Sequence, residues 1–219
     1  MDLKFNWNRY AELFDMFTFS HQRELLEDGL RFSKGKLLDL GCGVGKGFEH
    51  IPPEVEELVY VDMSPQMLKF AKRNAQNMPI SSRKITSRIE DLDFESLGSF
   101  DSICLFNSLY ACQNPFQVIE NCVGTLSLGG NLIVANQARS VNLEALLSSM
   151  SAQVNPSQQS SYESFLEMNR TLMGMSTFTP RTYELCELES IFEQYGLNIR
   201  YMTSKHFYGS CPLIVGTKE

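Results

Sequence analysis

The stretch that most constrains the fold is residues 37–47, where an apolar run changes abruptly into a glycine-rich one. Three leucines surround Asp39, and residues 41–47 then contain four glycines. The apolar part is typical of a short buried strand. Glycine has no Cβ atom, so it accepts positive φ angles and lets the backbone approach a bound molecule closely. The pattern therefore predicts a strand followed by a loop that contacts a ligand.

Apolar runs of strand length alternate with segments of helix length along the chain. The expected strands are 36–40, 58–61, 84–89, 102–106, 131–135, 197–203 and 213–217. The expected helices are 48–51, 65–77, 115–126, 143–150, 162–173 and 182–194, with a tight turn at 127–130. Strands that alternate with helices across short links form βαβ units and a mainly parallel sheet. We therefore expect an α/β protein with a doubly wound sheet of about seven mostly parallel strands and helices on both faces.

Polar residues follow several of the expected strands. Asp62 comes after the second strand, Glu90 and Asp91 after the third, and Asn107 after the fourth. In open α/β sheets, ligands bind outside the carboxyl ends of the strands, near the point where the strand order reverses. We expect these residues and the glycine loop to line one crevice.

Two common phosphate-binding loops do not fit residues 41–47. A P-loop needs G-x-x-x-x-G-K-[ST], but Leu40 occupies its first glycine position and Gly47 its hydroxyl position. The dinucleotide fingerprint needs G-x-G-x-x-G, and its third glycine would fall on Lys46 or Phe48. What remains is an acid followed by alternating glycines, with a second acid after the next strand. A carboxylate at that second place suits the two hydroxyls of a ribose.

Charge and cysteine usage limit the partners. The net charge is -7, and the chain has no dense cluster of Lys and Arg, which argues against nucleic acid. No apolar run approaches the ~20 residues that span a bilayer, and residues 1–4 do not resemble a secretory signal. The six cysteines form no C-x-x-C pair, which argues against structural zinc. We expect a cytoplasmic monomer or homodimer with no metal site and no membrane or nucleic-acid partner.

The ordered set of motifs resembles the class I S-adenosylmethionine-dependent methyltransferases, in particular those that act on small molecules. The motifs are residues 39–45, 61–68, 89–92, 98–101 and 128–132. The resemblance covers residues 36–136 closely and 182–219 loosely. It implies a Rossmann-like fold, a single domain over residues 1–219, and S-adenosyl-L-methionine as the methyl donor, with S-adenosyl-L-homocysteine as the product.

The resemblance also implies roles for residues after the first two strands. Asp39 is expected to orient the loop and the ammonium group of the methionine part. Asp62 is expected to accept hydrogen bonds from both ribose hydroxyls, and Met63 to pack against the adenine. The backbone expected to pass close to the methionine part and the ribose belongs to Gly41, Cys42, Gly43 and Gly45.

The adenine end departs from the pattern of many relatives. Where these carry an acid, this chain has Arg88, which cannot accept a hydrogen bond from the adenine amino group. Either Glu90 or Asp91 accepts that bond, or the Ile89 backbone N–H recognises adenine alone; we favour Ile89 together with Glu90. The residues expected to flank the methionine part are Phe106 and Asn107.

No catalytic base is evident. Methyl transfer is an in-line displacement at a sulfonium, to which an enzyme chiefly contributes proximity and alignment. Tyr110, at a position where relatives often carry histidine, and His206, expected in an exposed loop between the last two strands, are candidate catalytic residues. Tyr10 is expected to contact the cofactor, because an aromatic ring attracts the sulfonium cation.

Two segments lie outside the alternating pattern. Residues 1–34 are helical and aromatic and are expected to form an N-terminal arm or lid, with Ser20 capping its second helix. Residues 138–180 are rich in Ser, Gln and Met, and inserts of this length are usually functional. We expect them to form a helical insert that caps the substrate.

These observations favour an enzyme that transfers a methyl group to O, N or C of a small organic molecule. Flexible apolar side chains in the arm and the insert suit such an acceptor. Two alternatives remain open. The chain could bind the cofactor without transferring methyl, as a cyclase or a regulatory binder, or it could methylate a protein.

Overall fold

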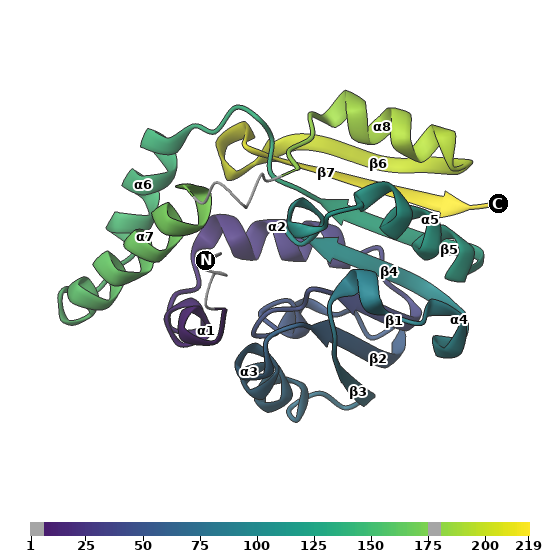
Figure 1. Ribbon diagram of the computed structural model, residues 1–219, viewed down its shortest axis with the longest axis horizontal. Helices are drawn as coiled ribbons and strands as arrows, with labels where there is room; N and C mark the ends of the chain where they lie inside the picture. The colour runs from purple at the N-terminus through teal and green to yellow at the C-terminus, as the bar shows by residue number, and fades with distance from the viewer. Residues whose placement is uncertain (1–6, 175–180) are drawn as a thin grey trace.

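The computed structural model describes residues 7–174 and 181–219, so residues 1–6 of the predicted arm and 175–180 of the predicted insert lie outside the described residues. Its centre is a seven-stranded sheet in the order β3-β2-β1-β4-β5-β7-β6 (Figure 1). The strands are β1 (Gly35–Leu40), β2 (Val55–Asp62), β3 (Ser81–Thr86), β4 (Phe100–Phe106), β5 (Leu126–Ala135), β6 (Leu197–His206) and β7 (Cys211–Lys218). Only β7 runs antiparallel to its neighbours. The predicted doubly wound, mostly parallel sheet is confirmed.

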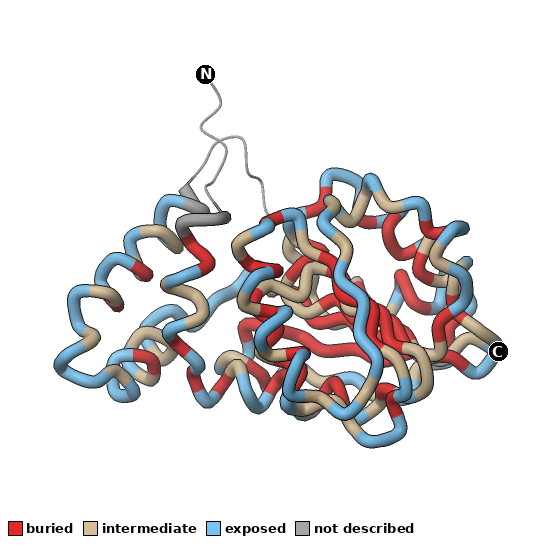
Figure 2. The backbone as a smooth tube through the Cα atoms, turned by 90° about the horizontal axis from the view of Figure 1, so that it is seen from below, coloured by how far each residue is buried: buried red, intermediate tan, exposed pale blue. Residues whose placement is uncertain are grey.

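Helices cover both faces of the sheet. They are α1 (Trp7–Met16), α2 (Ser20–Leu30), α3 (Pro65–Ala75), α4 (Phe94–Leu97), α5 (Pro115–Thr125), α6 (Leu143–Ala152), α7 (Gln159–Gly174) and α8 (Leu185–Gln194). Because side chains alternate along a strand, Val59 and Val61 join one core with α4, α5 and α8. Leu58 and Tyr60 join the other core with α2 and α3. Buried residues are concentrated in the strands and on the inward faces of these helices (Figure 2).

A third apolar cluster lies beyond the sheet. It joins α1 and the link to α2 with α6 and α7, which Figure 1 shows at the same end of the molecule. Val44 of the glycine loop and Met67 of α3 belong to the same cluster. The two segments predicted to lie outside the alternating pattern therefore pack on each other, next to the glycine loop.

Several predicted boundaries were wrong, and four of them have a clear local reason. The third strand covers 81–86 instead of 84–89, because it pairs with β2 and ends opposite Asp62. The last helix starts at Leu185 instead of 182, because Glu184 forms its capping box. Residues 127–130 belong to β5, although the pairing with β4 passes over them as a bulge. Phe19, and not Ser20, is the N-cap of α2.

No helix in the described ranges is long and apolar enough to cross a membrane. The six cysteines are free thiols. Among the described residues, no group of three or more His, Cys, Asp or Glu side chains could hold a metal ion.

The carboxylate of Asp28 connects α2 to the edge strand β6. One of its oxygens, Oδ2, lies 2.9 Å from each of three atoms: Tyr201 OH, His206 Nε2 and Lys205 Nζ. Its Oδ1 lies 3.0 Å from Arg31. Burial by itself raises the pKa of Asp28, but hydrogen bonds from Lys205, Tyr201 and His206 outweigh it, so the pKa lies below its ordinary value.

We predict that Asp28→Ala lowers the free energy of unfolding by about 2 kcal/mol at pH 7, because it removes charge-assisted hydrogen bonds. A depressed carboxyl pKa contributes stability above the unfolded value and loses it as the pH falls through the folded value. The difference from wild type should therefore be constant at neutral pH and shrink below the ordinary pKa of 3.8. Urea unfolding at several pH values measures this. Glu27→Ala, an exposed neighbour on α2, is the control, and an equal loss in both variants would contradict the prediction.

Candidate functional site

The candidate site lies at the carboxyl ends of β1, β2 and β4. The strand order reverses between β1 and β4, which is where open α/β sheets bind ligands. The loop after β1 starts with two backbone hydrogen bonds: the N–H groups of Gly41 and Cys42 donate to the Val61 carbonyl at 2.8 and 2.9 Å. The loop is thereby fixed to the end of β2.

Gly41, Gly43 and Gly45 adopt positive φ angles of 80°, 56° and 75°. At Gly41 there is also no room for a side chain, because a Cβ atom would lie 2.4 Å from the Cβ of Ser108. The Ser108 hydroxyl donates to the Leu40 carbonyl at 2.6 Å. The loop therefore packs directly on the segment that follows β4, which explains the alternating glycines.

Asp62 ends β2 and braces the glycine loop. Its Oδ2 accepts a hydrogen bond from the Gly43 N–H at 3.0 Å, and its Oδ1 accepts one from the Ser64 N–H at 2.8 Å. Burial raises the pKa of Asp62, although hydrogen bonds from the Ser64, Gly43 and Met63 backbone oppose this effect. Ser64 in turn caps α3 through Met67 N. The predicted ribose-binding carboxylate thus has a structural function as well.

Asp39 lies at the end of β1, close to Asp62. Burial raises the pKa of Asp39 to about 7, the Cys104 thiol opposes this with a hydrogen bond, and the negative charge of Asp62 adds to it. Burial also raises the pKa of the Cys42 thiol. Two carboxylates near each other create a site that favours a cation, because a positive charge would relieve their repulsion.

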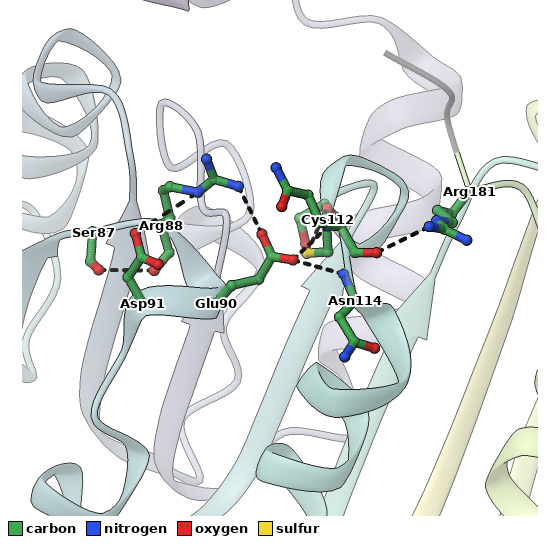
Figure 3. Close-up of polar contacts among 9 residues, drawn as sticks. Ser87, Arg88, Glu90, Asp91, Cys112, Asn114 and Arg181 are labelled. Atoms are coloured by element: carbon green, nitrogen blue, oxygen red, sulfur yellow. Dashed lines mark hydrogen bonds and ion pairs between the residues drawn. The ribbon is translucent and has the colours of Figure 1, made fainter. Parts of the chain in front are cut away.

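Glu90 has a structural role that the sequence did not predict. It accepts hydrogen bonds from the backbone N–H groups of Gln113 and Asn114, the latter at 2.8 Å, and from Arg88 at 3.0 Å (Figure 3). Glu90 therefore connects the turn after β3 to the start of α5. Burial raises the pKa of Glu90, but these bonds outweigh it and lower the pKa.

Ile89 contacts the glycine loop. Its Cδ1 atom lies 3.6 Å from the position that a Cβ of Gly41 would occupy. No acceptor in the described part of the chain takes the Ile89 backbone N–H. The structure therefore brings Ile89, Gly41 and Asp62 to one edge of the sheet, and the adenine contacts of Ile89 and Glu90 stay a prediction.

Phe106 ends β4 and Asn107 follows it, but their side chains contact α2 and β7. The Phe106 ring fills the space beside Gly29, where an added Cβ would be 2.6 Å away. Asn107 has a φ of 49°, and its Oδ1 accepts a hydrogen bond from the Cys211 thiol at 3.5 Å. Their expected contact with the methionine part stays a prediction.

The two tyrosines have different surroundings. Tyr10 is buried in α1; its hydroxyl donates to Asn169 Oδ1 at 3.0 Å and its ring stacks on Phe165. Tyr110 follows β4, and burial, with a smaller contribution from the negative charge of Asp62, raises its pKa to about 12. Tyr110 therefore lies near the predicted ribose site.

His206 does not lie in an exposed loop, so that prediction was wrong. It ends β6, is 4% exposed, and is paired with Asp28. The edge strand is longer than its apolar pattern suggested and carries the histidine into the core. The pairing with Asp28 gives His206 a structural role that accounts for its burial.

The structure adds Lys46 to the site. Its ammonium donates to the Phe17 carbonyl and to Gln22 Oε1, and it lies 4.3 Å from the centre of the Phe14 ring. Burial lowers the pKa of Lys46 to about 7. Lys46 thus fastens the N-terminal arm to the glycine loop. From the sequence, Lys46 mattered only because it occupies a glycine position of the dinucleotide-binding fingerprint. No local pattern indicated its contacts with Phe17 and Gln22.

We predict that Gly41→Ala destabilises the protein more than Gly98→Ala. Gly98 has nearly the same φ, 76°, but nothing lies within 4 Å of its Cβ position. The Gly98 variant should lose about 1–3 kcal/mol from backbone strain alone, because its ψ of −166° lies in a region that essentially only glycine adopts. Gly41→Ala should lose ~2 kcal/mol more, from the clash with Ser108. Urea unfolding compares the two, and equal losses would show that the loop does not pack tightly.

The chain is similar to known methyltransferases. Residues 38–134 match the family described as "Methyltransferase domain". The ubiquinone biosynthesis O-methyltransferase of Xanthomonas euvesicatoria pv. vesicatoria is 26% identical over 116 residues, which are 53% of this chain and 48% of the relative. The chain thus spans about half the length of this relative.

Two solved methyltransferases, both in complex with S-adenosyl-L-homocysteine, share the fold. N-methyltransferase NodS from Bradyrhizobium japonicum has a TM-score of 0.64 and 18% identity, covering 96% of this chain and 98% of its own. Magnesium protoporphyrin IX methyltransferase from Synechocystis has a TM-score of 0.58 and 16% identity, covering 97% and 84%. The resemblance seen in the motifs is confirmed: residues 38–134 match the methyltransferase domain family, and the chain has the fold of the class I S-adenosylmethionine-dependent methyltransferases.

Proposed function

We propose that this protein is an S-adenosyl-L-methionine-dependent methyltransferase that acts on O, N or C of a small organic molecule. The observation that carries the proposal is the position of Asp62. Its carboxylate ends β2 and has two acceptor oxygens, which brace Gly43 and Ser64 and also interact with the Met63 backbone. Two vicinal hydroxyls of a ribose fit such an acceptor pair.

The other residues of the site fit the same donor. Asp39 and Asp62 together favour a cation, which suits the ammonium group of a methionine part. The Ile89 N–H is available to an adenine nitrogen. When bound, the donor supplies an activated methyl group, and the protein contributes the alignment of acceptor and sulfonium. The S-adenosyl-L-homocysteine bound to NodS and to the Synechocystis enzyme supports this choice of donor.

We also propose that the arm, residues 1–34, and the insert, residues 138–180, cap the acceptor. Their packing on each other beside the glycine loop supports this role. The net charge of -7 supports a small molecule over nucleic acid. The six free thiols support the cytoplasmic location expected from the sequence. A cofactor binder without methyl transfer and a protein methyltransferase are the alternatives.

Titration calorimetry with S-adenosyl-L-methionine, S-adenosyl-L-homocysteine and NAD tests the donor. We expect the wild type to bind both sulfur compounds and not NAD. Asp62→Ala should weaken binding at least ten-fold, because a charge-assisted hydrogen bond contributes roughly 1.5–3 kcal/mol. Since Asp62 also braces the loop, a melting curve of each variant must accompany the titration.

Glu56→Ala is the matched control, because Glu56 is an exposed acid on the same strand. It should bind as the wild type does. A folded wild-type protein that binds neither sulfur compound would refute the proposal. Labelled methyl transfer to a panel of small acceptors then separates an enzyme from a binder.

Lys46→Met tests whether the arm is fastened by the glycine loop. Methionine keeps the length of the side chain but cannot donate to Phe17 and Gln22. We expect faster dissociation of S-adenosyl-L-homocysteine, by about five-fold for the loss of roughly 1 kcal/mol. Stopped-flow displacement measures this rate. Lys69→Met, an exposed lysine on α3, is the control, and equal rates in both variants would argue against a fastened arm.

A further inference from the structure

A continuous set of aromatic rings links the arm, the insert and the turn between β6 and β7. We call it the aromatic cap. Its members are Tyr10, Phe14, Phe17, Phe19, His21, Tyr162, Phe165 and Phe207. Stacked pairs include Phe17 with Phe19 at 5.8 Å and Phe19 with His21 at 5.6 Å. Planar surfaces from three distant parts of the chain thus meet in one place.

Two members of the aromatic cap carry buried polar atoms that have no hydrogen-bond partner among residues 7–174 and 181–219. They are His21 Nδ1 and the Tyr162 hydroxyl, in side chains that are 7% and 3% exposed. Both rings lie beside Phe19, at centroid distances of 5.6 and 6.3 Å. An unpaired buried polar group costs roughly 1–3 kcal/mol, so a bound molecule that pairs with both atoms would gain this free energy.

The surroundings of His21 prepare it to accept a hydrogen bond. Burial, and to a smaller extent the positive charge of Lys46, lower its pKa, so the ring is neutral at pH 7 and one nitrogen is an acceptor. The Phe207 ring contacts it edge-on at 4.5 Å. Phe207 and Tyr208 both have positive φ angles, 50° and 57°, and such strain is typical of functional sites.

The aromatic cap adjoins the proposed methyl-donor site. The Phe14 ring lies 3.6 Å from the position that a Cβ of Gly43 would occupy. Val44 of the glycine loop packs in the same cluster as Phe17, Phe19 and Tyr162. A molecule held by the cap would therefore lie beside the loop that is proposed to bind the donor.

We propose that the aromatic cap binds the methyl acceptor, and that this acceptor is a planar aromatic molecule carrying hydroxyl groups. Its ring packs against the aromatic side chains, one hydroxyl donates to His21 Nδ1, and a second polar atom pairs with the Tyr162 hydroxyl. The inference rests on the proposed function, since it names the substrate class of the same site. It uses two buried polar atoms to which the described part of the chain offers no hydrogen-bond partner.

Catechol is the probe, titrated by NMR into the full chain saturated with S-adenosyl-L-homocysteine. Cyclohexane-1,2-diol is the matched ligand, because it has two hydroxyls but no aromatic face. We expect catechol to bind and the diol to bind at least ten-fold more weakly. Tyr162→Phe and His21→Phe keep a ring at each position, and each should weaken catechol about five-fold, which corresponds to the loss of roughly 1 kcal/mol.

The melting temperature separates this role from a structural one. Without ligand, Tyr162→Phe should melt at or above the wild-type temperature, because it deletes an unpaired buried hydroxyl. Tyr195→Phe removes a hydroxyl that donates to the Phe116 carbonyl on the far side of the sheet, and it should bind catechol as the wild type does.

Three results would overturn the inference: no catechol binding, equal binding of catechol and the diol, or wild-type catechol affinity in both ring variants. The titration with S-adenosyl-L-homocysteine alone distinguishes these failures from a failure of the proposed function. If that compound binds and catechol does not, the donor site stands and the aromatic acceptor is refuted.

Discussion

The arrangement of the site depends on the carboxylate of Asp62. It accepts hydrogen bonds from Gly43, in the loop after β1, and from Ser64, which starts α3. One side chain thus fixes the glycine loop, the end of β2 and the first turn of a helix relative to one another. The cost of burying this charge is offset by backbone donors, which is the usual condition for a buried carboxylate. The same oxygens face the edge of the sheet where a ribose is proposed to bind.

The second organising constraint is the contact between the N-terminal arm and the insert. The arm carries Tyr10 to α7, about 160 residues away, where its hydroxyl meets Asn169. Lys46 fastens the same arm to the glycine loop, and Arg73 of α3 pairs with Asp15 at 2.8 Å. The glycine loop and the aromatic cap are therefore one packed unit, so a change in the cap is expected to reach the loop.

Polar side chains at the strand ends serve the fold as well as the site. Glu90 accepts a hydrogen bond from Asn114 at the start of α5, and His206 pairs with Asp28 of α2. From the sequence, Glu90 was predicted to help recognise adenine, and His206 was a candidate catalytic residue expected in an exposed loop. Their partners lie 24 and 178 residues away, and such pairings leave no mark in the local sequence.

The sequence by itself determined the sheet and the glycine loop. Alternating apolar runs and glycines at 41, 43 and 45 reflect local requirements, namely burial on both faces of a parallel strand and positive φ angles. Tertiary structure decided the rest. The end of β3 is set by pairing with β2, the partners of Lys46 by the path of the arm, and the aromatic cap by contacts between segments more than 100 residues apart. Such contacts depend on where the chain returns in space, which spacing along the sequence does not encode.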